Sequence, residues 1–264
     1  MPQNRSFLPP DTPFLPSNTP FLPKFECSKR GRHIPVNYTI FFMKGAAILF
    51  FQYGKIEIDY LKSRDKILGN AIDKIGHIER AVDTDVFPSI IHHIIGQQIS
   101  TAAQKTIWER MNNELVTITE DLICDLSVER IQNFGMTFRK AEYIRDFSHK
   151  VKNGELNING LKDKSDNEVI KELSNLKGIG QWTAEMIMIF CFQRSDILSY
   201  ADLAIHRGLR MLYHHRDISK KMFEKYRRRY SPYCTVASLY LWSIAAGTIE
   251  GMKDYVPKKK REIK

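Results

Sequence analysis

The chain has 264 residues, 43% of them apolar and 27% charged, which is typical of a globular protein with one large domain or two small ones. Its formal net charge of +10 indicates an anionic partner, namely nucleic acid, a membrane surface or an acidic protein. No paired spacing links Cys27, Cys124, Cys191 and Cys234, which disfavours both a disulfide framework and a zinc site. The longest apolar run, residues 39–51, is too short for a transmembrane helix, and no signal peptide precedes it, so we expect a cytoplasmic protein.

The N-terminal segment carries a seven-residue proline repeat, FLPPDTP followed by FLPSNTP and a third FLP. Proline at this density blocks both helices and central strands. We therefore expect residues 1–42 to be a disordered extension that takes no part in the chemistry, with a proline-rich peptide ligand as the alternative. Met43 begins a stretch typical of a bacterial start, so the extension could also lie outside the natural protein. The folded domain is expected over 43–255, followed by a basic tail at 256–264.

Helical periodicity dominates the rest of the chain, and the sequence predicts an all-α fold. The first predicted helix, 57–75, is interrupted by the polar residues 63–66, and 87–111 reads as one long helix or two in series. The remaining helices are expected at 119–133, 138–153, 166–176, 181–192, 202–213, 219–230 and 236–250. Only short apolar pieces near 46–52 have the character of strands.

A Gly-x-Gly turn lies between two of these helices, in the sequence Leu-Lys-Gly-Ile-Gly-Gln-Trp-Thr-Ala that starts at Leu176. Backbone N–H groups at such a turn and helix N-terminus can bind a phosphate. Asp202 follows a short distance later, although an acidic side chain in a basic chain does not increase affinity for DNA. The turn therefore predicts a phosphate-binding site, and the aspartate indicates a role other than affinity for DNA.

These residues resemble the helix-hairpin-helix (HhH-GPD) DNA glycosylase superfamily, and the Trp-Thr-Ala after the turn resembles the branch of bacterial 3-methyladenine DNA glycosylase II. The resemblance covers residues 85–250. It implies two helical subdomains that flank a cleft, with the helix-hairpin-helix motif as the DNA anchor. It also implies a base-excision repair enzyme that removes alkylated purines such as 3-methyladenine and 7-methylguanine. The four-cysteine iron–sulfur motif of some members is absent, and we expect no cofactor.

Asp202 is the expected catalytic residue. A carboxylate near C1′ stabilises the positive charge that develops on the sugar and can orient the attacking water. An alkylated purine that is already cationic leaves without a separate acid. The alternative role of Asp202 is to cap the helix that starts at Leu203, and the two roles are compatible.

Trp182 bears on the type of reaction. In relatives that also nick the strand, a lysine at this position attacks C1′, and tryptophan offers no such nucleophile. We therefore expect a monofunctional glycosylase, with Lys177 contacting a phosphate instead. A plain core aromatic is the alternative for Trp182.

The hairpin itself is expected to bind the DNA backbone. Gly178 and Gly180 allow a tight turn, and their N–H groups, with that of Trp182, can reach phosphate oxygens. By its position in the motif, the turn could also hold a monovalent cation on carbonyls of Ser174, Leu176 and Ile179.

Base flipping also requires a wedge and a pocket. The segment Gly-Gln-Gln-Ile-Ser matches the family's wedge, so Gln98 is expected to fill the gap in the base stack, with Gln97 beside it. Aromatic walls suit a cationic purine. The expected pocket residues are Trp242, Met186, Tyr200 and Phe87, although Trp242 could equally belong to the helix core.

The remaining charged residues support this partner without specifying it. Arg207 and Arg210 could contact phosphate or pair with a carboxylate, and the basic runs near 220–229 and 258–261 add attraction to DNA. The histidines do not have the spacing of a metal site. We expect double-stranded DNA with a damaged base as the partner and a monomeric protein without membrane contact. A glycosylase for an oxidised or deaminated base and a non-catalytic DNA-binding module remain the alternatives.

Overall fold

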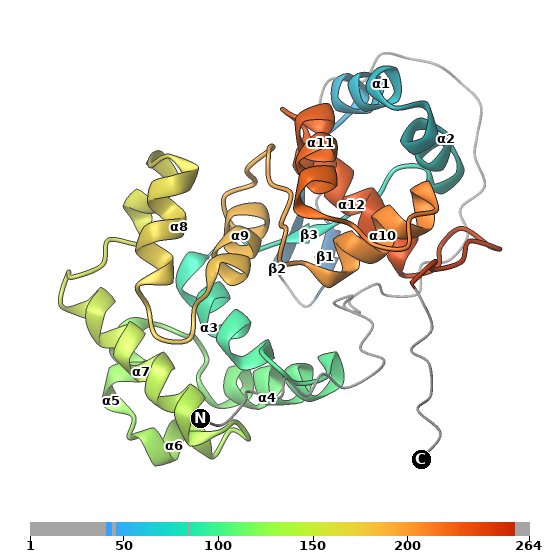
Figure 1. Ribbon diagram of the computed structural model, residues 1–264. Helices are drawn as coiled ribbons and strands as arrows, with labels where there is room; N and C mark the ends of the chain where they lie inside the picture. The colour runs from blue at the N-terminus through green and yellow to red at the C-terminus, as the bar shows by residue number, and fades with distance from the viewer. Residues whose placement is uncertain (1–40, 44–45, 84, 257–264) are drawn as a thin grey trace, which may run out of the picture.

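The computed structural model describes residues 41–43, 46–83 and 85–256 (Figure 1). The expected disorder of 1–42 and the basic tail therefore lie almost entirely outside the described residues. The first strand, β1 (Phe41–Met43), nevertheless begins two residues before the domain boundary expected at Met43. Within the described part, no helix is long and apolar enough to cross a membrane.

Helices form most of the described chain, as the sequence predicts. Their bounds are α1 Lys55–Arg64, α2 Lys66–Ile75, α3 Val86–Gly96, α4 Thr101–Glu114, α5 Glu120–Asp125, α6 Val128–Gln132, α7 Phe138–Lys152, α8 Asp166–Ser174, α9 Gln181–Phe190, α10 Leu203–Tyr213, α11 Lys220–Tyr230 and α12 Cys234–Ala245. A short 3-10 helix, η1, spans Asn159–Asp163. The all-α prediction is confirmed.

The helices form two groups, which Figure 1 shows side by side. The middle of the chain, from α3 to α9, makes one group, and α1, α2, α10, α11 and α12 make the other. The second group therefore joins helices from both ends of the described chain, as the family resemblance implies.

A small antiparallel sheet lies between the two groups, in the order β1–β2–β3. Its other strands are β2 (Ala46–Phe50), where the sequence shows apolar pieces, and β3 (Ala81–Val82), which has too few residues to show a pattern. Leu49 pairs with Val82. Just after β3, the N–H of Asp83 donates to the carbonyl of Phe190 at 2.8 Å, which fastens the sheet to the end of α9.

Polar caps explain the breaks between consecutive helices. Asp65 separates α1 from α2 because its carboxylate accepts from the N–H groups of Ile67 and Leu68, both at 3.0 Å, and so starts a new helix. Ser100 does the same for α4, so that the stretch 87–111 forms two helices in series. Ser127 likewise divides 119–133 into α5 and α6.

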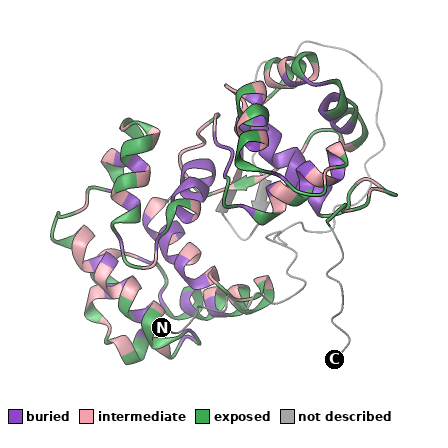
Figure 2. Ribbon diagram, viewed as in Figure 1, coloured by how far each residue is buried: buried purple, intermediate pink, exposed green. Residues whose placement is uncertain are grey.

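The core runs through both groups, as the purple ribbon in Figure 2 shows. Helices α9 and α12 are buried along almost their whole length, and both are apolar nearly all round. At Gly208 of α10, a Cβ would lie 2.3 Å from the carbonyl oxygen of Leu241. Only glycine allows α10 and α12 to pack this closely, which fixes the position of the Asp202 end of α10.

Candidate active site and the neighbouring turns

The hairpin forms between α8 and α9, where the sequence predicts it. Gly178 has a φ of +83°, which L side chains rarely adopt, and a Cβ there would lie 2.3 Å from Cδ2 of Tyr143 on α7. Gly180 is the N-cap of α9 and has open space around it. The turn is thus fixed on one side by Tyr143, and the N-terminus of a ten-residue helix follows it.

A second turn, residues 97–100 between α3 and α4, is fastened to the hairpin. The amide Nε2 of Gln97 donates to the carbonyl of Gly178 at 2.5 Å. Lys140 of α7 donates to the carbonyls of Ile95 and Gln97, at 2.7 and 2.5 Å, and burial lowers the pKa of this lysine. Gln97, which the sequence suggested as a DNA contact, therefore holds the two turns together.

Gln98 is exposed at the tip of this second turn. Its φ of +57° lies in the left-handed region, an uncommon conformation for a residue other than glycine. The preceding residue, Gln97, is held by its own side chain on Gly178 and by Lys140 on its carbonyl. The strain has a use if the side chain must project from the surface, which is the geometry that a wedge requires.

Asp202 caps α10. Its Oδ1 accepts from the N–H groups of Ala204 and Ile205 at 2.8 and 2.9 Å, and the side chain sits at the positive end of the helix dipole. The residue is only 6% exposed. The capping role weighed from the sequence is thus confirmed, and it fixes the direction of the carboxylate.

Trp182 lies against the other oxygen of the same carboxylate. Its indole Nε1 donates to Asp202 Oδ2 at 2.9 Å. A carboxylate oxygen has two lone pairs, so Oδ2 retains one for a water or a sugar. The sequence placed these two residues in one site, and the structure brings them together.

Tyr200 lies two residues before Asp202 and is 40% exposed. Its ring meets Phe223 and His206 edge-on, with centroids 5.0 Å away in both contacts. The ring of His206 stacks on Phe223 at 5.5 Å, and its Nε2 is 2.8 Å from the Tyr200 carbonyl. Tyr200 is thus held by α10 and α11 beside Asp202 while part of its ring stays accessible.

The other three expected pocket residues are buried. Trp242 is 9% exposed and stacks on Phe190 at 5.8 Å, and Met186 is 3% exposed within α9. Phe87 is 3% exposed, and its ring stacks on Phe147 of α7 at 5.0 Å. In this structure Phe87 is a core residue, and Trp242 also has the core contacts that the sequence left open. Their part in a base pocket stays a prediction.

Glu185 is a feature that the sequence analysis missed. This carboxylate is 7% exposed inside α9. Its Oε1 accepts from Gln181 Nε2 at 2.9 Å, and its Oε2 accepts from the hydroxyl of Ser199. A single charge within the apolar run 182–190 was the available signal, because a buried carboxylate requires partners.

The basic residues divide between paired and exposed ones. Arg210 makes a bidentate ion pair with Asp254, at 2.8 and 2.7 Å, and Arg207 lies 3.8 Å from the same carboxylate. Of the two roles considered for these arginines, pairing with a carboxylate is the observed one. Lys177 is exposed on the hairpin and pairs with Asp146 at 3.3 Å, so its contact with a phosphate stays a prediction.

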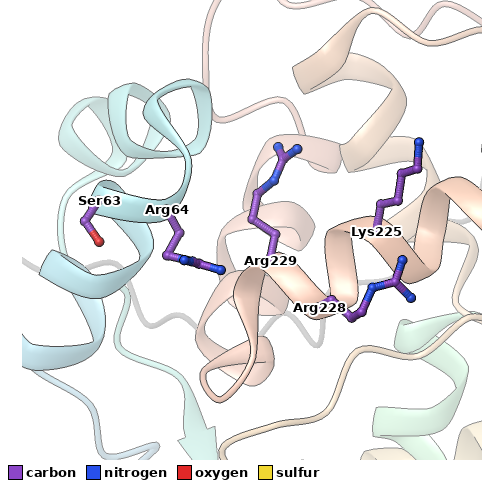
Figure 3. A pocket seen from close by; sticks show the side chains of 5 residues that line it. All are labelled: Ser63, Arg64, Lys225, Arg228 and Arg229. Atoms are coloured by element: carbon purple, nitrogen blue, oxygen red, sulfur yellow. The ribbon is translucent and has the colours of Figure 1, made fainter.

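The basic run at the end of α11 lines a cavity of about 350 Å³ against α1 (Figure 3). Its cationic residues are Arg64, Lys225, Arg228 and Arg229. Arg229 pairs with the buried Asp65 at 2.5 Å. A second cavity, of about 370 Å³, lies between α2 and α10. Neither of these two cavities is lined by Asp202 or Trp182, so the expected cleft and base pocket stay predictions.

The hairpin carbonyls proposed for a cation are partly engaged. The carbonyl of Leu176 accepts from the N–H of Ile179 at 3.1 Å, which leaves it one lone pair. A cation on Ser174, Leu176 and Ile179 therefore stays a prediction. The described residues contain no group of three or more histidine, cysteine or acidic side chains that could hold a metal ion.

Comparison with known proteins gives the family. Residues 91–232 match the HhH-GPD superfamily of base excision DNA repair proteins. The crystal structure of a DNA-3-methyladenine glycosidase from Bacillus halodurans is similar at a TM-score of 0.69 and 32% identity, over 77% of this chain and 95% of that one. The DNA-3-methyladenine glycosylase 1 of Schizosaccharomyces pombe is 29% identical over 161 residues, which are 59% of this chain and 71% of the relative.

One further neighbour has a different substrate. The 8-oxoguanine glycosylase/lyase of Clostridium acetobutylicum, solved with DNA containing cytosine opposite 8-oxoguanine, has a TM-score of 0.62 at 24% identity, over 75% of this chain and 73% of that one. This likeness concerns the fold alone. The chain belongs to the HhH-GPD superfamily of base excision DNA repair proteins.

Proposed function

We propose that this chain is a monofunctional DNA glycosylase that hydrolyses the N-glycosidic bond of alkylated purines in double-stranded DNA. The observation that carries the proposal is the Trp182–Asp202 pair, which lies at the N-terminal ends of α9 and α10. The relatives named DNA-3-methyladenine glycosylases support the substrate class.

The chemistry follows from the orientation of the carboxylate. The bond between C1′ and the base nitrogen breaks, and its electron pair leaves with the base, which neutralises an alkylated purine cation. Water adds to C1′ and loses a proton. Asp202 stabilises the cationic sugar, and the free lone pair of Oδ2 can accept a hydrogen bond from the attacking water. Since tryptophan stands at position 182, no amine is available there to attack C1′ and nick the strand.

The two turns support DNA binding. The hairpin offers N–H groups and Lys177 to the backbone, while exposed Gln98 projects from the turn that Gln97 fastens to it. A duplex held on both turns would present its damaged nucleotide toward the Asp202 end of α10. We expect the protein to act as a cytoplasmic monomer.

The test is release of free base from methylated duplex DNA by the full chain, measured together with strand nicking. We expect 3-methyladenine or 7-methylguanine without nicking, and a loss of about 10²–10⁴-fold in Asp202→Asn, the range for a group that assists proton transfer and stabilises charge. Asp85→Asn is the matched control, because Asp85 also caps a helix, α3, through its side chain. Equal losses in both variants would mean that Asp202 is a cap alone.

Two other outcomes separate the alternatives. Release of an oxidised or deaminated base instead would keep the mechanism and change the substrate. DNA binding without release of any base, with Asp202→Asn binding as the wild type does, would favour a binding module.

A further inference from the structure

We infer that Glu185 is a positioning residue that couples the DNA-binding hairpin to the turn carrying Asp202. This inference rests on the proposed function, since it assigns a role in the same reaction. Glu185 lies on α9, five positions after Gly180 and three after Trp182. The residues that it contacts belong to both parts of the site.

The hairpin side of the contact is Gln181, the first residue of α9. Its side-chain Nε2 donates to Glu185 Oε1 at 2.9 Å. Gln181 is exposed, directly after the N-cap Gly180, where we expect the helix N-terminus to meet a phosphate. If a phosphate moved the Gln181 side chain, the hydrogen bond from Gln181 to Glu185 would change with it.

The catalytic side is Ser199. Its hydroxyl donates to Glu185 Oε2, and its backbone carbonyl accepts from the N–H of Asp202 at 3.3 Å. Ser199 is 1% exposed, and the turn from Ser199 to Asp202 leads directly into α10. Glu185 therefore fixes Ser199, which begins the turn that ends at Asp202.

The energetic cost of burying the Glu185 carboxylate indicates that its hydrogen bonds hold the turn in place rather than stabilise the fold. A buried carboxylate loses much of its hydration, and two neutral donors replace it only in part. No ion pair of Glu185 is found among the described residues. An apolar side chain of similar length would fill the same space without this cost. The chain carries a charge here at the expense of stability, which is expected where geometry matters, because a displacement of about 1 Å can slow a reaction about 10²-fold.

The experiment compares Glu185→Met, Glu185→Gln and Ser199→Ala in single-turnover base release at saturating DNA. Glu185→Met removes both acceptors, and we expect its rate to fall 10- to 100-fold, on the order of the geometric effect above. Glu185→Gln should retain most of the rate, because the Ser199 hydroxyl can accept from the new amide. Glu172→Met, which removes a carboxylate of α8 paired with Lys164, is the control expected to release base at the wild-type rate.

The double variant tests whether Glu185 acts through Ser199. Combined with Ser199→Ala, Glu185→Met should cost little more than it does alone. DNA affinity should stay near that of the wild type, and the melting temperature of Glu185→Met should not fall below it. A wild-type rate in Glu185→Met would overturn the inference, as would a rate in Glu185→Gln as low as in Glu185→Met, which would indicate a need for the charge. If the wild-type chain releases no base, the proposed function has failed instead.

Discussion

The indole Nε1 of Trp182 donates a hydrogen bond to Oδ2 of Asp202, with 2.9 Å between the two atoms. Twenty residues separate them along the chain, and the contact joins the second residue of α9 to the cap of α10. Since Oδ1 is already held by two backbone N–H groups, the indole fixes the remaining rotation of the carboxylate.

Replacing Trp182 by Phe removes this donor and keeps most of the ring. We expect base release to slow about tenfold, because a hydrogen bond to a charged group contributes about 1.5–3 kcal/mol, and the lower value corresponds to a factor of ten. Single-turnover rates at saturating DNA measure the effect. Trp108→Phe serves as the control, because Trp108 lies in α4 of the same helix group and packs on His92 rather than on Asp202. Similar slowing in both variants would assign the loss to stability.

Gln98 should show opposite effects on stability and activity. Gln98→Gly relieves the left-handed φ of +57°, so the free energy of unfolding should rise by up to about 1 kcal/mol, while base release falls because the wedge is gone. Gln98→Ala removes the amide without relieving the backbone, so it should lose activity and gain no stability. Denaturant unfolding and base release measure the two effects. Wild-type rates in both variants would exclude Gln98 as the wedge.

Gly178→Ala tests the close approach of the hairpin to α7. The substitution meets both a positive φ and Tyr143 at 2.3 Å, whereas Gly154→Ala meets a φ of +73° with nothing within 4 Å. Each should lose about 1–2 kcal/mol through the backbone. Only Gly178→Ala should also weaken binding to undamaged duplex DNA, because the turn must move. Binding isotherms and thermal melts distinguish the two effects, and equal DNA affinities would count against the hairpin as the anchor.

The free energy of unfolding should depend on pH because the pKa of His93 is lowered in the folded protein. Burial, with a smaller effect of neighbouring His92, lowers the pKa of His93 to about 4, and its Nε2 is buried without a hydrogen-bond partner. The ordinary pKa is near 6.5, so the unfolded chain takes up the proton first. Stability from this group is present above about pH 6.5 and is lost as the pH falls toward 4.

The expected loss is on the order of 3 kcal/mol. Unfolding of the wild type and of His93→Leu between pH 7.5 and 4 measures it. His93→Leu should show a flatter profile over this interval, whatever its stability at neutral pH. Parallel profiles would show that another group is responsible.

Local patterns made most of the fold predictable. The segments predicted from helical periodicity and capping residues contain every α-helix between 55 and 245, but the 3-10 helix η1 was not predicted. Asp65 and Ser100 mark breaks that the apolar pattern alone leaves ambiguous. The strands β1 and β3 were harder, because two or three residues contain too little pattern and depend on pairing with distant segments.

The site was predictable where a motif fixes the position of a residue. Gly178, Trp182 and Asp202 fall in such a motif, and Trp182 and Asp202 do meet. Gln97 and Phe87 were harder to interpret, because their partners Gly178 and Phe147 lie more than fifty residues away. Glu185 was missed although its single charge in an apolar run was a local signal, because no local pattern connects it to its partner Ser199.

Helix α9 also restricts where the chain can change in length. Gly180, Trp182 and Glu185 occupy less than two turns of one helix, where Trp182 contacts Asp202 and Glu185 contacts Ser199. Inserting one residue between Trp182 and Glu185 would rotate Glu185 by about 100° relative to Trp182 and shift it by about 1.5 Å along the helix. Trp182 could then no longer contact Asp202 while Glu185 contacts Ser199, the residue at the start of the same turn.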